Sequence, residues 1–225
     1  MAQFTLYSHK GPGPNPLKVA ILLEKLGLSY NVVPLIFGPG DGQNEGVKGE
    51  KFLKVNPNGR VPALVDHQNS DFTIWESGAI LLYLIDKYGQ DGSFGGKTPE
   101  ERAVVNQWFA LQLSTFGPQQ GQVNYAYHYW EATYGEKPQK SVFTRFEGEV
   151  ARLYTLLNDQ LEAQSKRGSS FVALERPTVA DIAFYPWVNI AGFGKIDLAP
   201  YPAVGKWHAA LAADADVKKA QAALS

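Results

Sequence analysis

The sequence contains no cysteine among its 225 residues. This absence excludes disulfide bonds, metal sites built from thiolates and a cysteine nucleophile. If the protein carries out thiol chemistry, the sulfur must therefore arrive with a ligand. The histidines, which are His9, His67, His128 and His208, lie far apart without the spacing of metal ligands. We interpret them as structural or surface residues and expect no metal site.

Long apolar runs and an excess of charge of one sign are also missing. No stretch approaches the roughly 20 apolar residues that a transmembrane helix needs, and residues 1–4 lack the basic flank of a signal peptide. The sequence has 21 basic and 22 acidic residues, a net charge of -1, which does not favour a nucleic-acid binder. We therefore expect a cytoplasmic protein that binds neither membranes nor nucleic acids.

The first part of the chain has the pattern of a small α/β domain. Short apolar or alternating segments predict strands over residues 3–8, 30–35, 61–66 and 72–74. Apolar residues at helical spacing predict helices over residues 17–27 and 77–88. Residues 38–49 form a polar, glycine-rich loop. The expected order is therefore β-α-β, a loop, and β-β-α.

The composition changes after the second of these helices. Residues 89–99 contain four glycines and a proline, which is typical of a linker. Beyond it, helical patterns replace strands, over residues 100–112, 142–164, 179–190 and 204–224. We therefore divide the chain into an α/β domain at 1–88, a linker at 89–98 and an all-α domain at 99–225.

Pro62 stands at the start of a predicted strand, directly after a turn-forming segment at residues 56–60. A proline removes a donor from the sheet ladder, so its presence there needs a reason. One reason is a cis Val61–Pro62 bond, which would turn the Val61 backbone toward a ligand; the other is an ordinary proline on an edge strand. Only about 5–6% of X–Pro bonds are cis, so the proline alone does not decide between them.

Glu76 and Ser77 open the helix that follows the predicted hairpin. Serine is a favoured N-cap, and the amides of a helix start can bind a carboxylate. Glu76 could accept hydrogen bonds from the ammonium group of a ligand. Plain helix capping is the commoner role of such a pair.

In combination, the strand, the proline turn, the hairpin and the Glu–Ser pair resemble the glutathione site of glutathione transferases. The chain is similar to the bacterial nu class and to the fungal class related to the yeast nitrogen-catabolite regulator over nearly its whole length. The segments that carry the similarity are residues 76–84, 117–122, 145–154, 185–189 and 201–204. The resemblance implies a thioredoxin-like α/β domain that binds glutathione, an all-α domain with a hydrophobic co-substrate site, and a homodimer.

The resemblance also assigns roles to single residues. The backbone of Val61, before the cis-proline Pro62, would pair with the cysteinyl backbone of glutathione. Glu76 and Ser77 would hold its γ-glutamyl end.

Basic residues before the proline turn would reach the glycyl carboxylate of glutathione. Lys48 is the best match by position, Lys51 is an alternative and Arg60 is a weaker candidate. Exposed lysines are otherwise ordinary solvated surface.

The loop before the first helix would carry the catalytic group. Where other classes use Tyr, Ser or Cys, the resembling classes have a Pro-Asn pair, here Pro14–Asn15. Asn15 could donate an N–H to the sulfur and stabilise the thiolate, but it cannot remove the proton; a turn or N-cap role is the alternative. The related pattern usually has a threonine where this chain has Gly13. Ser8 is therefore the second catalytic candidate, ahead of Tyr7.

Residues 125–130, Tyr-Ala-Tyr-His-Tyr-Trp, are unusually aromatic for a helix surface. They would form either the wall of a co-substrate site, with His128 as its polar group, or packing between helices. The helix start at Thr178–Asp181 is a capping-box pattern with a folding role.

Two functions stay open. The first is a glutathione transferase that conjugates electrophiles or reduces disulfides or peroxides. The second is a non-catalytic ligand carrier or regulator on the same fold.

Overall fold

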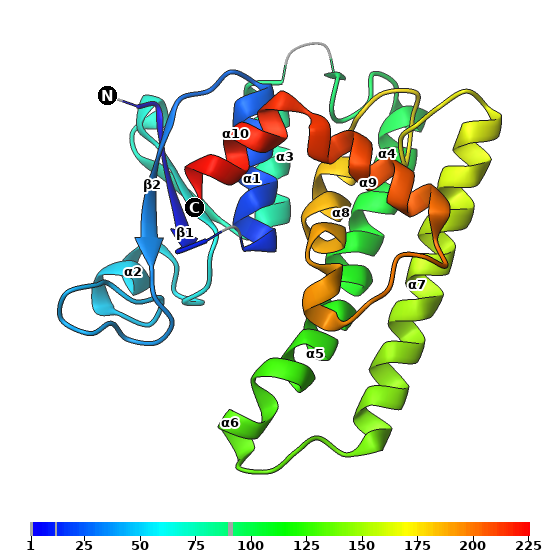
Figure 1. Ribbon diagram of the computed structural model, residues 1–225. Coiled ribbons are helices and arrows are strands. Elements are labelled where there is room, and N and C mark those ends of the chain that lie inside the picture. The colour runs from blue at the N-terminus through cyan, green and yellow to red at the C-terminus, as the bar shows by residue number, and fades with distance from the viewer. Residues whose placement is uncertain (1, 12, 90–91) are drawn as a thin grey trace. The chain divides into compact units, whose positions relative to one another are not determined.

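The computed structural model describes residues 2–11, 13–89 and 92–225 of the chain. The chain divides into two compact units, which are described separately (Figure 1). Residues up to Gly92 together with Ala212–Ser225 form an α/β unit, and Ser93–Leu211 form a helical unit. The expected fold class is confirmed. Residues 90–91 of the expected linker lie outside the described part.

The α/β unit is built on a sheet with the strand order β2-β1-β3-β4. Its strands are β1 (Phe4–His9), β2 (Tyr30–Leu35), β3 (Ala63–Asp66) and β4 (Phe72–Trp75). β1 is parallel to β2 and antiparallel to β3, which pairs antiparallel with β4. The alternation of β1 buries Phe4, Leu6 and Ser8 completely and turns Tyr7 and His9 to the opposite face.

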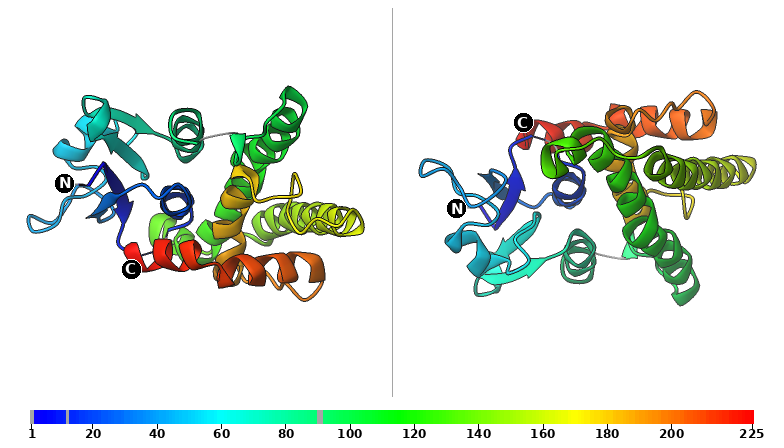
Figure 2. Two further views of the ribbon diagram at one scale, coloured as in Figure 1. Left: turned by 90° about the horizontal axis from the view of Figure 1, so that it is seen from above. Right: turned by 90° about the horizontal axis from the view of Figure 1, so that it is seen from below.

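Helices cover both faces of this sheet (Figure 2). α1 (Pro14–Lys25) packs against α3 (Ser77–Lys87) on one face. On the other face, Phe52 of α2 (Glu50–Val55) joins a core with Leu35, Val47 and Ala63. α2 was not expected from the sequence, because it is short and follows a glycine-rich segment without a side-chain cap.

The C-terminal part of the chain corrects two expectations. The single helix predicted over residues 204–224 is divided into α9 (Pro202–Ala213) and α10 (Ala215–Ala223). The break lies at Asp214, whose carboxylate accepts hydrogen bonds from the backbone N–H groups of Asp216 and Val217 and so caps α10. α10 packs on α1, so the last residues group with the α/β unit and not with the all-α domain expected at 99–225.

The helical unit contains α4 (Pro99–Leu111), a π-helical turn at Gln112–Phe116, α5 (Gly117–His128), α6 (Trp130–Tyr134), α7 (Lys140–Lys166) and α8 (Val179–Asn189), besides most of α9. The capping box predicted at the start of α8 is confirmed. Buried Asp181 accepts hydrogen bonds from the N–H groups of Val172, Thr178 and Trp207, so it ties α8 to a loop and to α9. No helix in the described ranges is long and apolar enough to cross a bilayer.

Candidate functional site

Two pockets adjoin each other in the α/β unit, at the ends of β1 and β3 nearest to the start of α1. The first is lined by Asn15, Asn56, Asn58, Arg60, Val61, Pro62, Glu76 and Ser77. The second is lined by His9, Gly13, Pro14, Asn15, Pro16, Phe37, Gly38, Val47, Lys48, Gly59, Arg60 and Val61. Asn15, Arg60 and Val61 line both pockets. The two pockets therefore form one extended site with these residues at its middle.

The first pocket brings the two predicted motifs together. The Val61–Pro62 bond is cis, and both residues lie with Glu76 and Ser77 in the same lining. Asn56 supports the turn before them, because its side-chain amide donates to the carbonyl of Arg60 at 2.6 Å. Residues that are 15 positions apart in sequence, such as Val61 and Glu76, are thus neighbours in one site.

Glu76 has an uncommon backbone conformation, with φ 74° and ψ 119°. A non-glycine residue in such a region costs about 1–3 kcal/mol, and such residues gather at functional sites. Glu76, rather than Ser77, is the N-cap of α3, and no side chain caps this helix. The plain capping role considered for the pair is therefore absent. The Glu76 side chain is exposed, and Ser77 is the first, buried residue of the helix.

Asn15 lies in the first turn of α1, where helix amides create positive potential. The N-cap is Gly13, and its carbonyl accepts from the N–H of Leu17. Pro14 and Pro16 have no N–H, so Asn15 is the one residue of the first three helical positions that keeps a backbone donor. An anion at this end of α1 would meet Asn15 first.

The other catalytic candidate, Ser8, is not brought to the two pockets. It is fully buried on the core side of β1, and its hydroxyl donates to the carbonyl of His9 at 3.0 Å. Tyr7 packs against Phe52, with 5.4 Å between the ring centroids, and lines neither pocket.

The basic candidates are separated by the structure. Lys48 lines the second pocket, and its ammonium donates to the carbonyl of Asn58 at 2.9 Å. Gly59 permits this approach, because a Cβ there would lie 2.7 Å from Lys48 Nζ. Arg60 lines both pockets, whereas Lys51 is exposed on α2 and lines neither.

His9 is a site residue that sequence reasoning missed, because it was interpreted as structural or surface. Its ring stacks on Phe37, with centroids 4.1 Å apart, and its Nδ1 lies 3.3 Å from the carbonyl oxygen of Leu35. Burial lowers the pKa of His9 below its usual 6.5, against a smaller opposing effect of the Leu35 hydrogen bond. Since a carbonyl only accepts, a neutral His9 keeps its proton on Nδ1 and presents Nε2 as an acceptor.

Lys18 was also missed. It follows Asn15 by one helical turn and is only 1% exposed, within the buried side of α1. Burial lowers the pKa of the Lys18 ammonium to about 7, although the nearby Glu76 carboxylate acts in the opposite direction. The Glu76 carboxylate of the first pocket therefore acts on the charge of Lys18.

The helical unit has an aromatic cluster at the end of α5 and in α6. Tyr125 contacts the rings of Tyr129, Trp130 and Tyr134. Tyr129 is 46% and Tyr134 58% exposed. Part of the aromatic segment therefore faces outward, which distinguishes it from simple packing between helices.

Comparisons with known proteins identify the family to which both units are related. The family described as "Glutathione S-transferase, N-terminal domain" matches residues 2–86, and "Glutathione S-transferase, C-terminal domain" matches residues 109–214. The chain is 40% identical over 199 residues to "Glutathione S-transferase 2" of Schizosaccharomyces pombe, a match that covers 87% of this chain and 79% of that protein.

A second curated relative and one solved structure are also similar to this chain. "Disulfide-bond oxidoreductase YfcG" of Escherichia coli is 37% identical, over 88% of this chain and 85% of that protein. Among solved structures, the glutathione transferase URE2P6 from Phanerochaete chrysosporium, in complex with oxidized glutathione, has a TM-score of 0.84 and 38% identity and covers 100% of this chain and 98% of that one. These matches confirm the resemblance inferred from the motifs.

Proposed function

Because this chain belongs to the glutathione S-transferase family, we propose that the two adjoining pockets bind one glutathione molecule with its sulfur beside Asn15. Glutathione is a tripeptide whose middle residue is cysteine. The observation that carries the proposal is that Asn15 and Val61 line both pockets. A tripeptide that fills both pockets therefore places its middle residue beside Asn15 and Val61.

The ends of glutathione match the chemistry of the two pockets. In the first pocket, the exposed Glu76 carboxylate accepts from the γ-glutamyl ammonium, and Ser77 with the start of α3 binds the γ-glutamyl carboxylate. In the second, the ammonium of Lys48 binds the glycyl carboxylate. Arg60 lines both pockets and adds positive charge between them.

Asn15 supplies the chemistry of the site. The side-chain amide of Asn15 and the positive end of α1 favour the thiolate over the thiol and so lower the pKa of the bound sulfur. The thiolate then attacks an electrophilic carbon, where a carbon–sulfur bond forms as the leaving group, such as a halide, departs as an anion, or it attacks a disulfide sulfur. In the disulfide reaction it forms a glutathione mixed disulfide and releases the other sulfur as a thiolate. A second glutathione must complete the reduction, because the chain has no cysteine of its own.

Substitutions at the site separate binding from chemistry. Glu76→Ala and Ser77→Ala should abolish glutathione binding measured by calorimetry, whereas Asn15→Ala should retain binding and lower turnover. Lys48→Ala should weaken binding, with Lys51→Ala as the matched control because Lys51 lines neither pocket. Full activity of Asn15→Ala together with inactive Ser8→Ala would contradict the catalytic assignment.

A substrate panel distinguishes an enzyme from a carrier. Glutathione-dependent turnover should be measured with an aryl halide, an isothiocyanate, a mixed disulfide and a hydroperoxide. We expect turnover of at least one of these. No turnover of any of them, with tight binding of aromatic ligands, would favour the carrier.

We also propose a cytoplasmic homodimer. Phe72 and Trp75 of β4 and Leu82 of α3 are large apolar residues that are 39–43% exposed on the α/β unit, as expected of a surface that a second copy covers. Gel filtration at the single-chain mass of 24.7 kDa would contradict the dimer.

A further inference from the structure

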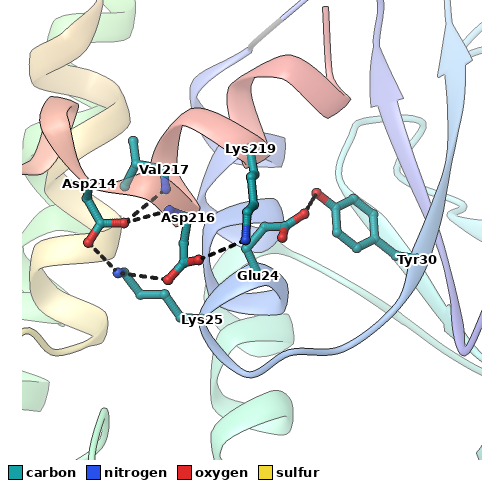
Figure 3. A network of polar contacts seen from close by, with 7 residues as sticks. All are labelled: Glu24, Lys25, Tyr30, Asp214, Asp216, Val217 and Lys219. Carbon is teal, nitrogen blue, oxygen red and sulfur yellow. Dashed lines mark hydrogen bonds and ion pairs between the residues drawn. The ribbon is translucent and has the colours of Figure 1, made fainter.

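The C-terminal helix α10 and the residues that flank it contact the last turn of α1, the helix that carries Asn15, and Gly11 in the segment before that helix. At one end, Lys25 in the last turn of α1 binds Asp214 at 2.9 Å and Asp216 at 3.7 Å (Figure 3). Only 10% of the Lys25 side chain is exposed, so this pair is better protected from solvent than an ordinary surface ion pair. Asp214 also caps α10, which couples the ion pair to the start of that helix.

At the other end, α10 reaches the loop before α1. The backbone N–H of Gly11 donates to the carbonyl of Leu224 at 3.0 Å. Leu224 follows α10 directly and is 3% exposed. Between these two contacts α10 packs along α1. Val217 and Ala220 are the buried residues of α10.

Two further backbone hydrogen bonds connect this contact to the first turn of α1, which contains Asn15. The Gly11 carbonyl accepts from the N–H of Gly13 at 2.8 Å, and the Gly13 carbonyl accepts from the N–H of Leu17 at 3.1 Å. Asn15 lies in the helical turn that the last bond closes. Three successive backbone hydrogen bonds therefore connect Leu224 with the first turn of α1.

Gly11 has open space where a side chain would lie. Gly11 has φ +92°, and a Cβ placed on it would meet no atom within 4 Å. Because glycine has broad conformational freedom, the hydrogen bonds of Gly11 to Leu224 and Gly13 restrain its backbone. The residues from Ala215 to Ser225 also lie outside both ranges that match the family.

We propose that α10 is a positioning element of the glutathione site. It holds the last turn of α1 and Gly11 before the first turn, and thereby sets the place of Asn15 against the glutathione sulfur. This proposal rests on the proposed function of the pockets. Its consequence is that the pKa of the bound thiol depends on residues 214–225, although these residues line neither pocket.

The decisive variant is Leu224→Asp, which places a charge at a buried position and displaces the end of α10. Asp214→Ala acts at the opposite end, and Lys218→Ala, on the exposed side of α10, is the matched control. Two properties should be measured: hydrogen exchange of the amides between residues 11 and 17, and the pKa of bound glutathione from the ultraviolet absorbance of its thiolate as a function of pH. Melting temperatures report general destabilisation.

We expect faster exchange over residues 11–17, a raised thiol pKa and a kcat/KM for glutathione lowered about tenfold in Leu224→Asp, the size of a lost hydrogen bond or two. Asp214→Ala should show smaller changes in the same direction, and Lys218→Ala none. If Leu224→Asp lowers only the melting temperature, with exchange and thiol pKa as in Lys218→Ala, α10 has a purely structural role and the proposal is overturned.

The exchange measurement needs no ligand, so it also separates this proposal from the proposed function. Unchanged exchange over residues 11–17 in Leu224→Asp contradicts the role of α10, whether or not glutathione binds. Faster exchange in Leu224→Asp, combined with a wild-type protein that fails to bind glutathione, supports the role of α10 but contradicts the proposed function of the pockets and, with it, the effect on the thiol.

Discussion

Lys18→Met tests the energetic cost of a buried ammonium in α1, the helix that carries Asn15. Lys18 is 1% exposed, and burial lowers its pKa from the usual 10.5 to about 7. At ~1.4 kcal/mol per pKa unit, a shift of this size corresponds to about 5 kcal/mol at most. Methionine has a similar length and no charge, so this variant removes the cost while it fills most of the same space.

The pH dependence gives the sign of the effect. Below pH 7, Lys18 is protonated in both the folded and the unfolded chain, and the folded protein bears the full cost. Between pH 7 and 10.5 the unfolded chain holds a proton that the folded chain has lost, so stability of the wild type rises with pH. Lys18→Met should therefore be more stable than the wild type at pH 6, by up to about 5 kcal/mol, and this advantage should shrink toward pH 10.

Urea unfolding at several pH values between 6 and 10 measures this difference. Lys54→Met is the control, because Lys54 is an exposed lysine of α2. A Lys18→Met protein that is less stable than the wild type at pH 6, or whose stability difference is the same at every pH, would refute the reasoning about burial.

Three further predictions concern Asp181, His9 and Gly59. Asp181→Ala leaves three buried N–H groups without their acceptor. Because each unsatisfied group costs ~1–3 kcal/mol, the free energy of unfolding should fall by at least ~3 kcal/mol. Glutathione affinity measured by calorimetry should not change. His9→Phe should reduce the loss of stability on acidification below pH 6.5, because the folded protein resists protonation of His9 more than the unfolded chain does; equal acid sensitivity of the two proteins in urea titrations would count against it. Gly59→Ala should weaken glutathione binding several-fold, because a Cβ would collide with Lys48 Nζ and the Val47 carbonyl; unaltered affinity in calorimetry would show that Lys48 can move without cost.

The motifs of the site could be predicted from the sequence because local chemistry marks them. A proline at a strand start and an acidic residue before a helix are visible in the printed chain, and the cis bond at Val61–Pro62 agrees with the first. The strand pattern of β1 was equally visible. Its alternation places Ser8 in the core and His9 on the other face, so the pattern of the strand, unlike the chemistry of a hydroxyl, favours His9 over Ser8 as a site residue.

Other features depend on contacts that no local pattern records. The burial of Lys18 follows from the packing of α1, where consecutive residues from Pro16 to Leu23 are buried, so helical periodicity could not have marked it. The break between α9 and α10 has a local signal, since aspartate is a favoured N-cap, but Asp214 lies within an alanine-rich helical pattern. The return of α10 to the α/β unit depends on tertiary contacts such as the pair of Lys25 with Asp214.

The two prolines at the start of α1 have a consequence for ion selectivity. A helix start with several adjacent N–H groups suits phosphate or sulfate, whose oxygens can each accept a separate bond. With Pro14 and Pro16 beside it, Asn15 offers its backbone donor without neighbours of the same kind. Having fewer adjacent backbone donors disfavours an oxyanion more than an anion whose charge sits on one atom, as in a thiolate.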